Sequence, residues 1–338
     1  MKARSLLAQA ILLCSLVLAF NTSITARSTT WQDKTAKTTV PEAEAKAAKA
    51  IEAAKDLNAK FAAAEEFVKK HATSKARPQV AHYLANQVFG VTDAAQRLAA
   101  AQKYIAIFTD PSEPKLVQPA LIEAYVQLNR VDEAFDSGAS YLASDDEDVT
   151  IRTLLAISGA ELARNQNVKH IKESREYGAK ALELMEADKK PAYMDDASWV
   201  KQKTMLPLLY QQMGIISLVE QNARDAEVKL EKAAKLNPAD PFNYALLGSI
   251  TNNDYQTLAL TVRGLPDGKS KDEMLQKANT ILDKVIEQYA KAVALSEGKA
   301  QYQPLHDQVM QDLTTYYKYR HNNSADGLQK YIDGYKLP

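Results

Sequence analysis

The sequence predicts an all-α protein assembled from antiparallel pairs of helices. Its composition is dominated by Ala, Lys, Glu, Leu and Gln, which favour helix. The 11 glycines and 12 prolines are few for 338 residues, and many of them separate helix-forming segments. No series of Val-, Ile- or Thr-rich runs alternates with period two, so a β-sheet is not expected.

Composition also limits the classes of partner. The chain is 46% hydrophobic and 25% charged, as expected for a folded protein with a substantial core. It carries 42 basic and 42 acidic residues. This balance leaves no basic field to attract a phosphate backbone, so nucleic acid is not expected as a partner.

The first 26 residues are typical of a secretory signal peptide. Lys2 and Arg4 precede an apolar run from Ser5 to Phe20, which is shorter than the roughly 20 residues that span a bilayer. Small residues near Ala26 offer a cleavage site. We therefore expect export of the chain, with an uncleaved membrane anchor as the alternative.

Cys14, the only cysteine, lies within this segment. A lipoprotein signal needs a small residue before its cysteine, but Leu12 and Leu13 stand there, so lipid attachment is not expected. A mature chain without cysteine would depend on packing for its stability. The histidines show no metal-ligand spacing, so we expect no metal and no cofactor, and we expect these residues at the surface or at helix ends: His71, His82, His170, His306 and His321.

Residues 27–41 are expected to form a flexible tether, because the segment from Arg27 to Val40 is polar, Thr-rich and without helical period. From Pro41 the sequence favours one leading helix that continues to Ala72. We interpret residues 42–112 as N-terminal helical hairpins separated by proline and glycine breaks.

The segment from Pro207 to Asp240 has the clearest pattern. Counted from Pro207, its first helix places Tyr210, Met213 and Gly214 at positions four, seven and eight, on one face. Its second helix does the same at positions 20, 24 and 27 with Ala226, Leu230 and Ala233. The small residues allow the two backbones to approach closely. A proline at position 32, Pro238, follows the last turn.

This pattern resembles the tetratricopeptide repeat, a 34-residue helix pair with these residue types at these positions. Position 11, which is often Tyr in that family, is Ser217, and we expect this departure to weaken the contact. The pattern recurs 34 residues later at Pro241, with Tyr244 and Gly248 at positions four and eight. The segment "GLPDGKS" then interrupts the unit, so residues 241–299 are interpreted as one enlarged repeat.

A weaker resemblance extends upstream, and residues 113–240 are interpreted as tetratricopeptide-like repeats. A unit that starts at Lys115 has Leu121 and Ala134 at positions seven and 20. Its position 24 is Gly138, which is expected to leave the packing thin. The alternative architecture is a helical bundle without repeats.

Residues 300–338 are expected to form a capping helix pair at the end of the array. The first helix carries an apolar stripe of Leu305, Val309, Leu313 and Tyr317. The final helix should begin at Asn323 or Ser324 and end near Gly334. The dense tyrosines of this segment suit a half-buried cap better than an interface.

The resemblance implies a right-handed α-solenoid in which the first helix of each pair lines a concave groove. The groove positions of the family correspond here to Gln211, Ile215, Leu218, Phe242, Asn252, Glu123 and Gln127. None of the groove positions is Lys or Arg, so the clamp that some members use for peptide carboxylates is not expected. The alternative for Ile215 and Leu218 is burial by an adjacent hairpin.

No motif in the sequence indicates catalysis. "SDDEDV", from Ser144 to Val149, lacks the ligand alternation and central Gly of a calcium loop, so we expect a solvated loop with a helix N-cap. "MDDASW", which begins at Met194, is interpreted in the same way. "GLPDGKS" lacks the strand and glycine spacing of a P-loop and is expected to be a turn. An enzyme is therefore not expected.

The sequence thus favours a non-enzymatic scaffold that binds a peptide or partner protein in its concave groove. By resemblance to other exported repeat proteins, we expect it in a bacterial periplasm, with membrane contact only through envelope partners. One alternative is a helical enzyme or small-molecule-binding protein with a pocket between hairpins. Another is a structural component of a cell-envelope assembly.

Overall fold

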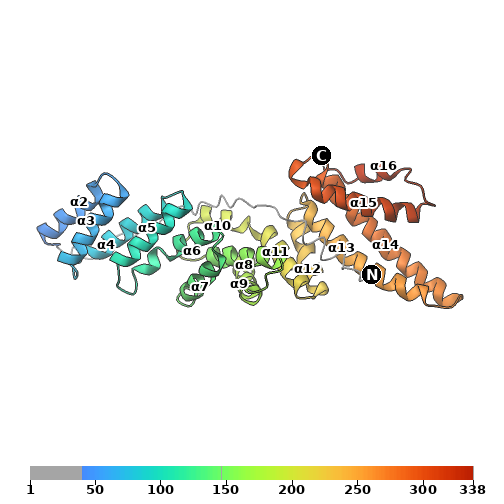
Figure 1. Cartoon of the computed structure of the whole chain (residues 1–338), viewed down its shortest axis with the longest axis horizontal. Helices are drawn as coiled ribbons and strands as arrows, with labels where there is room; N and C mark the ends of the chain where they lie inside the picture. Colours follow the sequence, from blue (N-terminus) through green and yellow to red (C-terminus); the bar gives the residue numbers. More distant parts are fainter. Residues whose placement is uncertain (1–39, 146, 338) are drawn as a thin grey trace. The chain divides into compact units, whose positions relative to one another are not determined.

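The computed structural model describes residues 40–145 and 147–337 (Figure 1). This part of the chain contains fifteen α-helices and two short 3-10 helices but no strand, which confirms the predicted all-α class. None of its helices combines the length and the apolar character that crossing a bilayer requires. The signal peptide expected at residues 1–26, and the expected tether up to residue 39, lie outside the described residues.

The chain divides into two compact units. Within the described residues, the N-terminal unit comprises 40–159 and 176–203, and the C-terminal unit comprises 160–175 and 204–337. The boundary passes through helices α8 (Val149–Arg164) and α9 (Ile171–Glu186), which contribute to both units.

Consecutive helices pack against one another within each unit. The remaining elements of the N-terminal unit are α2 (Glu42–Ala53), α3 (Leu57–Lys70), α4 (Arg77–Phe89), α5 (Ala94–Ile107), η1 (Pro114–Leu116), α6 (Gln118–Gln127), α7 (Val131–Leu142) and α10 (Asp196–Lys203). Those of the C-terminal unit are α11 (Leu206–Val219), α12 (Ala223–Leu236), α13 (Pro241–Arg263), α14 (Lys269–Ser296), η2 (Ala300–Tyr302), α15 (Gln303–Arg320) and α16 (Leu328–Asp333).

The single leading helix expected up to Ala72 is wrong, because the segment forms two helices, α2 and α3. The Asp56 side chain accepts a hydrogen bond from the backbone N–H of Ala59 at 2.8 Å and caps α3. The Lys60 ammonium donates to the carbonyl oxygen of Glu52 at 2.5 Å, a group that the end of α2 leaves without a helical partner. Side-chain hydrogen bonds at both helix ends thus compensate for the interruption of a strongly helix-forming segment.

A hydrophobic core extends through the N-terminal unit from α2 to α8. Its largest fully buried side chains include Ile51, Phe61, Leu84, Tyr104, Phe108, Ile122, Ile151 and Leu155. The rings of Tyr104 and Phe108 stack with centroids 4.6 Å apart. Burial of side chains of this size stabilises the fold by about 1.5–3 kcal/mol each.

Two glycines allow close helix contact in the C-terminal unit, as the sequence predicts. A Cβ atom on Gly214 of α11 would lie 2.9 Å from Cγ of Leu230 of α12. A Cβ atom on Gly248 would lie 2.5 Å from the ring of Tyr289, which joins α13 to α14. Any side chain at these positions would displace the neighbouring helix or its large residue.

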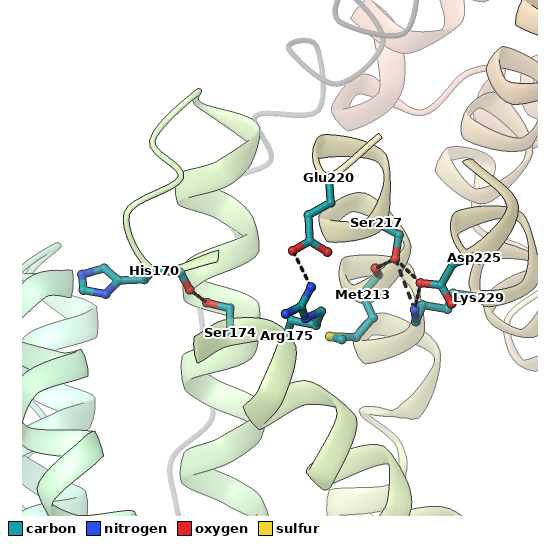
Figure 2. Close-up of polar contacts among 8 residues, drawn as sticks. All are labelled: His170, Ser174, Arg175, Met213, Ser217, Glu220, Asp225 and Lys229. Atoms are coloured by element: carbon teal, nitrogen blue, oxygen red, sulfur yellow. Dashed lines mark hydrogen bonds and ion pairs between the residues drawn. The ribbon is translucent and has the colours of Figure 1, made fainter. Parts of the chain in front are cut away.

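Ser217, at the position where the sequence departs from the repeat pattern, is buried and hydrogen-bonded. Its hydroxyl lies 2.5 Å from Oδ2 of Asp225 and 2.9 Å from the carbonyl oxygen of Met213 (Figure 2). The Lys229 ammonium contacts both Ser217 and Asp225. Burial acts to raise the pKa of Asp225, but hydrogen bonds from Lys229 and Ser217 outweigh it and lower the pKa overall. A buried polar cluster therefore occupies this position between α11 and α12.

Gly138 likewise does not leave the thin packing that the sequence suggests. A Cβ atom there would lie only 2.4 Å from Cδ1 of Leu155, so the leucine of α8 already occupies this space. The small residue on α7 is compensated by a large residue on the next helix.

The enlarged unit at residues 241–299 is a long helical hairpin. Helices α13 and α14 have 23 and 28 residues, against 14 in each of α11 and α12. Residues 264–268 of "GLPDGKS" connect them, which confirms the predicted turn. Five residues are enough to reverse the chain direction and place the two helices antiparallel.

The C-terminal helices pack as the apolar stripe predicts, because all four stripe residues are buried in one core with Leu328 and Ile332 of α16. The last helix begins at Leu328, later than expected. Asn322, Asn323 and Gly327 have positive φ angles, which an α-helix cannot include. The tyrosines of this region mostly pack against the core, with Tyr319 as the exposed exception.

The close contact at Gly248 can be tested with Gly248→Ala. Helix propensity alone would favour alanine by about 1 kcal/mol, but overpacking against the Tyr289 ring should produce a net loss of about 1–2 kcal/mol in the free energy of unfolding. Gly264→Ala is the matched control, because its Cβ would meet only a backbone oxygen at 3.6 Å. Urea unfolding measures both variants, and a Gly248→Ala variant as stable as the wild type would contradict the contact.

Candidate functional site

Six of the seven predicted groove residues are buried, with exposed fractions of 8% or less: Gln211, Ile215, Leu218, Phe242, Asn252 and Glu123. Only Gln127, at the end of α6, is exposed. Ile215 and Leu218 pack in one apolar cluster with Leu230 and Leu247, which bears out the alternative that an adjacent hairpin covers them. These six side chains therefore do not line an open groove, because neighbouring helices cover that face of the first helices.

The polar members of this set are satisfied inside the protein. Gln211 donates from Nε2 to Oδ2 of Asp240 at 2.8 Å and to Oδ1 of Asn243 at 3.0 Å. Asp240 also accepts a hydrogen bond from the backbone N–H of Phe242 and caps α13. Burial raises the pKa of the Asp240 carboxyl, and the two hydrogen bonds oppose this rise. Gln211 and Phe242 thus serve helix packing in the C-terminal unit.

Asn252 belongs to a second buried polar group, between α13, α14 and α15. Its Oδ1 atom accepts a hydrogen bond from Nε2 of Gln256 at 3.5 Å, and the side chain lies close to the hydroxyls of Tyr289 and Tyr316. Gln256 donates to the Tyr316 hydroxyl at 3.2 Å. Burial raises the pKa of both tyrosines, so the phenols remain neutral at physiological pH. This group of side chains connects three helices. Asn252 is buried within it and cannot contact a partner.

Glu123 forms a buried ion pair in the N-terminal unit. Its Oε2 atom lies 3.2 Å from Nη1 of Arg97, and both side chains are at most 10% exposed. Arg97 also donates from Nε to the carbonyl oxygen of Val91 at 2.7 Å. Removing one partner would leave the other charge buried without compensation, so Glu123 is a structural residue of the α5–α6 contact.

The Ser217, Asp225 and Lys229 cluster resembles the groups of a serine hydrolase but does not form a reactive site. Lys229 Nζ lies 3.2 Å from the serine hydroxyl, within reach of a general base. However, Lys229 is engaged in an ion pair with Asp225, and the Ser217 side chain is buried. Figure 2 shows the three side chains directed at one another between α11 and α12. Their arrangement therefore stabilises the helix pair.

An open cleft of about 240 Å³ lies beside α4 in the N-terminal unit. It is formed by α4, η1, the end of α7 with the connection that follows it, and the connection between α9 and α10. We call it the α4 cleft, and it is lined by His82, Ala85, Asn86, Phe89, Lys115, Leu116, Tyr141, Ser144, Asp145 and Tyr193. It thus offers aromatic, aliphatic, polar and charged side chains within one hollow.

Asp148 holds two tyrosines of the α4 cleft in place. Its side chain is fully buried and accepts a hydrogen bond from the Tyr141 hydroxyl at 2.7 Å and from the Tyr193 hydroxyl at 2.9 Å. It also accepts from the backbone N–H groups of Thr150 and Ile151, both at 3.1 Å, and so caps α8. One carboxylate therefore joins a helix start to two residues of the cleft.

A second open recess of about 320 Å³ adjoins the α4 cleft and shares His82 and Leu116 with it. We call it the Arg77 recess. The Arg77 guanidinium donates two hydrogen bonds, of 2.7 and 2.9 Å, to the Glu113 carboxylate, and both residues are buried. The hydrogen bonds to Glu113 raise the pKa of the Arg77 guanidinium, while burial opposes them. Bidentate pairs of this kind are among the strong hydrogen-bonded contacts in proteins, so the recess has a rigid wall.

Sequence reasoning did not find the α4 cleft. It placed all histidines at the surface or at helix ends; His170 directly precedes α9, but His82 lies half-buried within α4. It correctly assigned helix caps to both acidic segments, since Asp148 caps α8 and Asp195 accepts from Ser198 N at 2.7 Å to cap α10. However, it placed Asp148 in a solvated loop. One indication of the cleft is present in the sequence. Tyr141 precedes the acidic run, and its aromatic ring favours a position packed against other residues.

Within residues 40–145 and 147–337, no group of three or more His, Cys, Asp or Glu side chains is arranged to hold a metal ion. No family model and no curated protein sequence matches the chain. The interpretation of the two hollows therefore depends on their geometry and on the chemistry of their lining.

The burial of the predicted groove can be tested with Ile215→Glu. A carboxylate without a partner in this apolar cluster should lower the free energy of unfolding by more than about 3 kcal/mol. Gln127→Glu, at the exposed position of the same set, should change it by less than about 0.5 kcal/mol. Circular dichroism during urea unfolding gives both values, and wild-type stability of Ile215→Glu would restore the groove interpretation.

The role of Asp148 can be tested by comparing two helix caps. Asp195→Ala removes an exposed cap and should cost about 1 kcal/mol of unfolding free energy. Asp148→Ala removes a cap and also breaks the hydrogen bonds that the Tyr141 and Tyr193 hydroxyls donate to this carboxylate, so it should cost about 2–4 kcal/mol. Equal losses in denaturant unfolding would show that the tyrosine hydrogen bonds add nothing.

Proposed function

We propose that this chain is an exported, non-enzymatic interaction protein that binds an extended peptide segment of a partner protein. The binding site is the α4 cleft together with the Arg77 recess. The scaffold is a tetratricopeptide-like α-solenoid, in which the helices position this surface.

The register of the best repeat supports this architecture. Its pattern residues Tyr210, Met213, Ala226, Leu230 and Ala233 are all buried. Helices α11 and α12 fill the 34-residue unit from Pro207, and α13 begins where the next unit begins, at Pro241. Burial on the same positions as in the repeat family is expected if the helices stack in the same way.

The observation that carries the proposal is the continuity of two hollows with a prearranged lining. The α4 cleft and the Arg77 recess share two lining residues, so one ligand could occupy both. Buried hydrogen bonds at Asp148 and at Arg77 fix side chains in or beside them. A site that is ordered before binding loses less conformational entropy when the ligand arrives.

A peptide fits this lining better than a small substrate does. Neither hollow is enclosed, whereas small-molecule sites cover most of the ligand surface. The lining mixes an aliphatic residue, Leu116, an aromatic ring, Phe89, and polar groups along a surface, as in peptide recognition. The hydroxyls of Tyr141 and Tyr193 are directed to Asp148, an arrangement that orders the site and activates no nucleophile.

Export and an envelope location follow from the signal-like pattern of residues 1–26. In that compartment a cysteine-free mature chain suits a scaffold whose stability comes from helix packing. Contact with a membrane would then occur through a membrane-bound partner.

The proposal is tested by selection of peptides from a random display library on the purified protein. Asn86→Trp places a large ring in the α4 cleft from an exposed position and should weaken the selected peptides at least tenfold in fluorescence anisotropy. Gln79→Trp is the matched control, because Gln79 is exposed on the same helix but does not line the cleft. A library that yields no binder, or binders unaffected by Asn86→Trp, would overturn the assignment.

A further inference from the structure

We propose that the α4 cleft selects a basic side chain, lysine or arginine, of the bound segment, and that Asp145 is its acceptor. This inference rests on the proposed peptide-binding function and names the class of segment recognised. The preference follows from how hydrogen-bond donors are distributed around Asp148 and Asp145.

The tyrosine hydroxyls of the cleft have one proton each, and both protons have an assigned acceptor. Tyr193 lies 2.9 Å from Oδ1 of Asp148 and Tyr141 lies 2.7 Å from Oδ2. A carboxylate can only accept hydrogen bonds, so each hydroxyl must donate to it. Toward a ligand, these hydroxyl oxygens can then act as acceptors alone.

Asp145 is short of donors as a result. Its Oδ2 atom lies 3.1 Å from the Tyr141 hydroxyl, which is closer to Asp148 and cannot donate its single proton fully to both. No other side-chain hydrogen bond or ion pair reaches the Asp145 carboxylate from the described residues. Asp145 is half-buried and lines the cleft, so a ligand with N–H donors would supply what it lacks.

The surrounding groups favour a cation over a neutral donor. Asp145 and the buried Asp148 place two carboxylates at this end of the cleft. The rings of Tyr193 and Phe89 also line it, and aromatic faces attract ammonium and guanidinium groups. Lys115, on η1, is the opposing charge among the lining residues. It should repel a basic ligand and so act against the selection made by Asp145.

Asp145 and Lys115 carry opposite charges, so substitutions at the two positions should change the affinity for a basic peptide in opposite directions. Peptides selected from the random library should be enriched in Lys or Arg at one position, and exchange of that residue for norleucine should weaken binding about tenfold. Asp145→Asn should weaken the basic peptide about tenfold and leave the norleucine peptide unchanged. Lys115→Gln should tighten the basic peptide about twofold to fivefold, a smaller effect because Lys115 is exposed and screened by salt.

Glu147→Gln is the matched control, because it neutralises an exposed carboxylate of the same segment that does not line the cleft. It should leave the affinity of the basic peptide within twofold of the wild type. Circular dichroism of each variant verifies the fold.

The two proposals fail in different ways. Selected peptides that lose binding to Asn86→Trp but show no basic residue, or that bind Asp145→Asn as tightly as the wild type, would overturn the selection of a cation and leave peptide binding intact. Equal weakening by Glu147→Gln and Asp145→Asn would also overturn it, because the effect would then come from general charge. A library without binders overturns both proposals.

Discussion

Close contact between neighbouring helices is the constraint on which this structure depends. Each of three contacts places a glycine on one helix against a large residue on the next: Gly138, Gly214 and Gly248. The leucine or tyrosine opposite fills the volume that a side chain on the glycine would occupy. These contacts bring α7 close to α8, α11 close to α12, and α13 close to α14. Because protein interiors are packed as densely as crystals, even one added methyl group at these positions must displace a neighbour.

The same packing limits where the proposed peptide partner can bind. Inner positions of the first helices are covered, and their polar side chains contact other residues of the same unit, as Gln211, Asn252 and Glu123 show. Hydrogen-bonded groups of this kind add little net stability, but they penalise any arrangement that leaves them unpaired. The accessible hollows therefore lie where helices end and the chain turns. The α4 cleft combines a helix face with η1, the end of α7 and the connection before α10.

Asp148 connects the start of α8 to the proposed peptide site. Its carboxylate caps α8 and at the same time fixes Tyr141 and Tyr193 in the wall of the cleft. A fixed wall reduces the ordering cost of binding. The orientation of the hydroxyl protons toward Asp148 also gives the cleft an acceptor character, which extends to Asp145. One buried charge thus shapes both the fold of the N-terminal unit and the chemistry offered to a ligand.

By itself, the sequence determined the helical class, many helix ends and the small residues at close contacts. Periodicity, prolines such as Pro207 and Pro241, and capping acids such as Asp195 are local signals, and local signals can be read along the chain. It did not show the break at Asp56, where two side-chain hydrogen bonds outweigh helix propensity. Only the tertiary structure decided which helix faces are covered, because the covering residues come from other hairpins. It alone brought Tyr193 to Asp148 across 45 positions of the chain, and such a pairing leaves no mark on the residues around either partner.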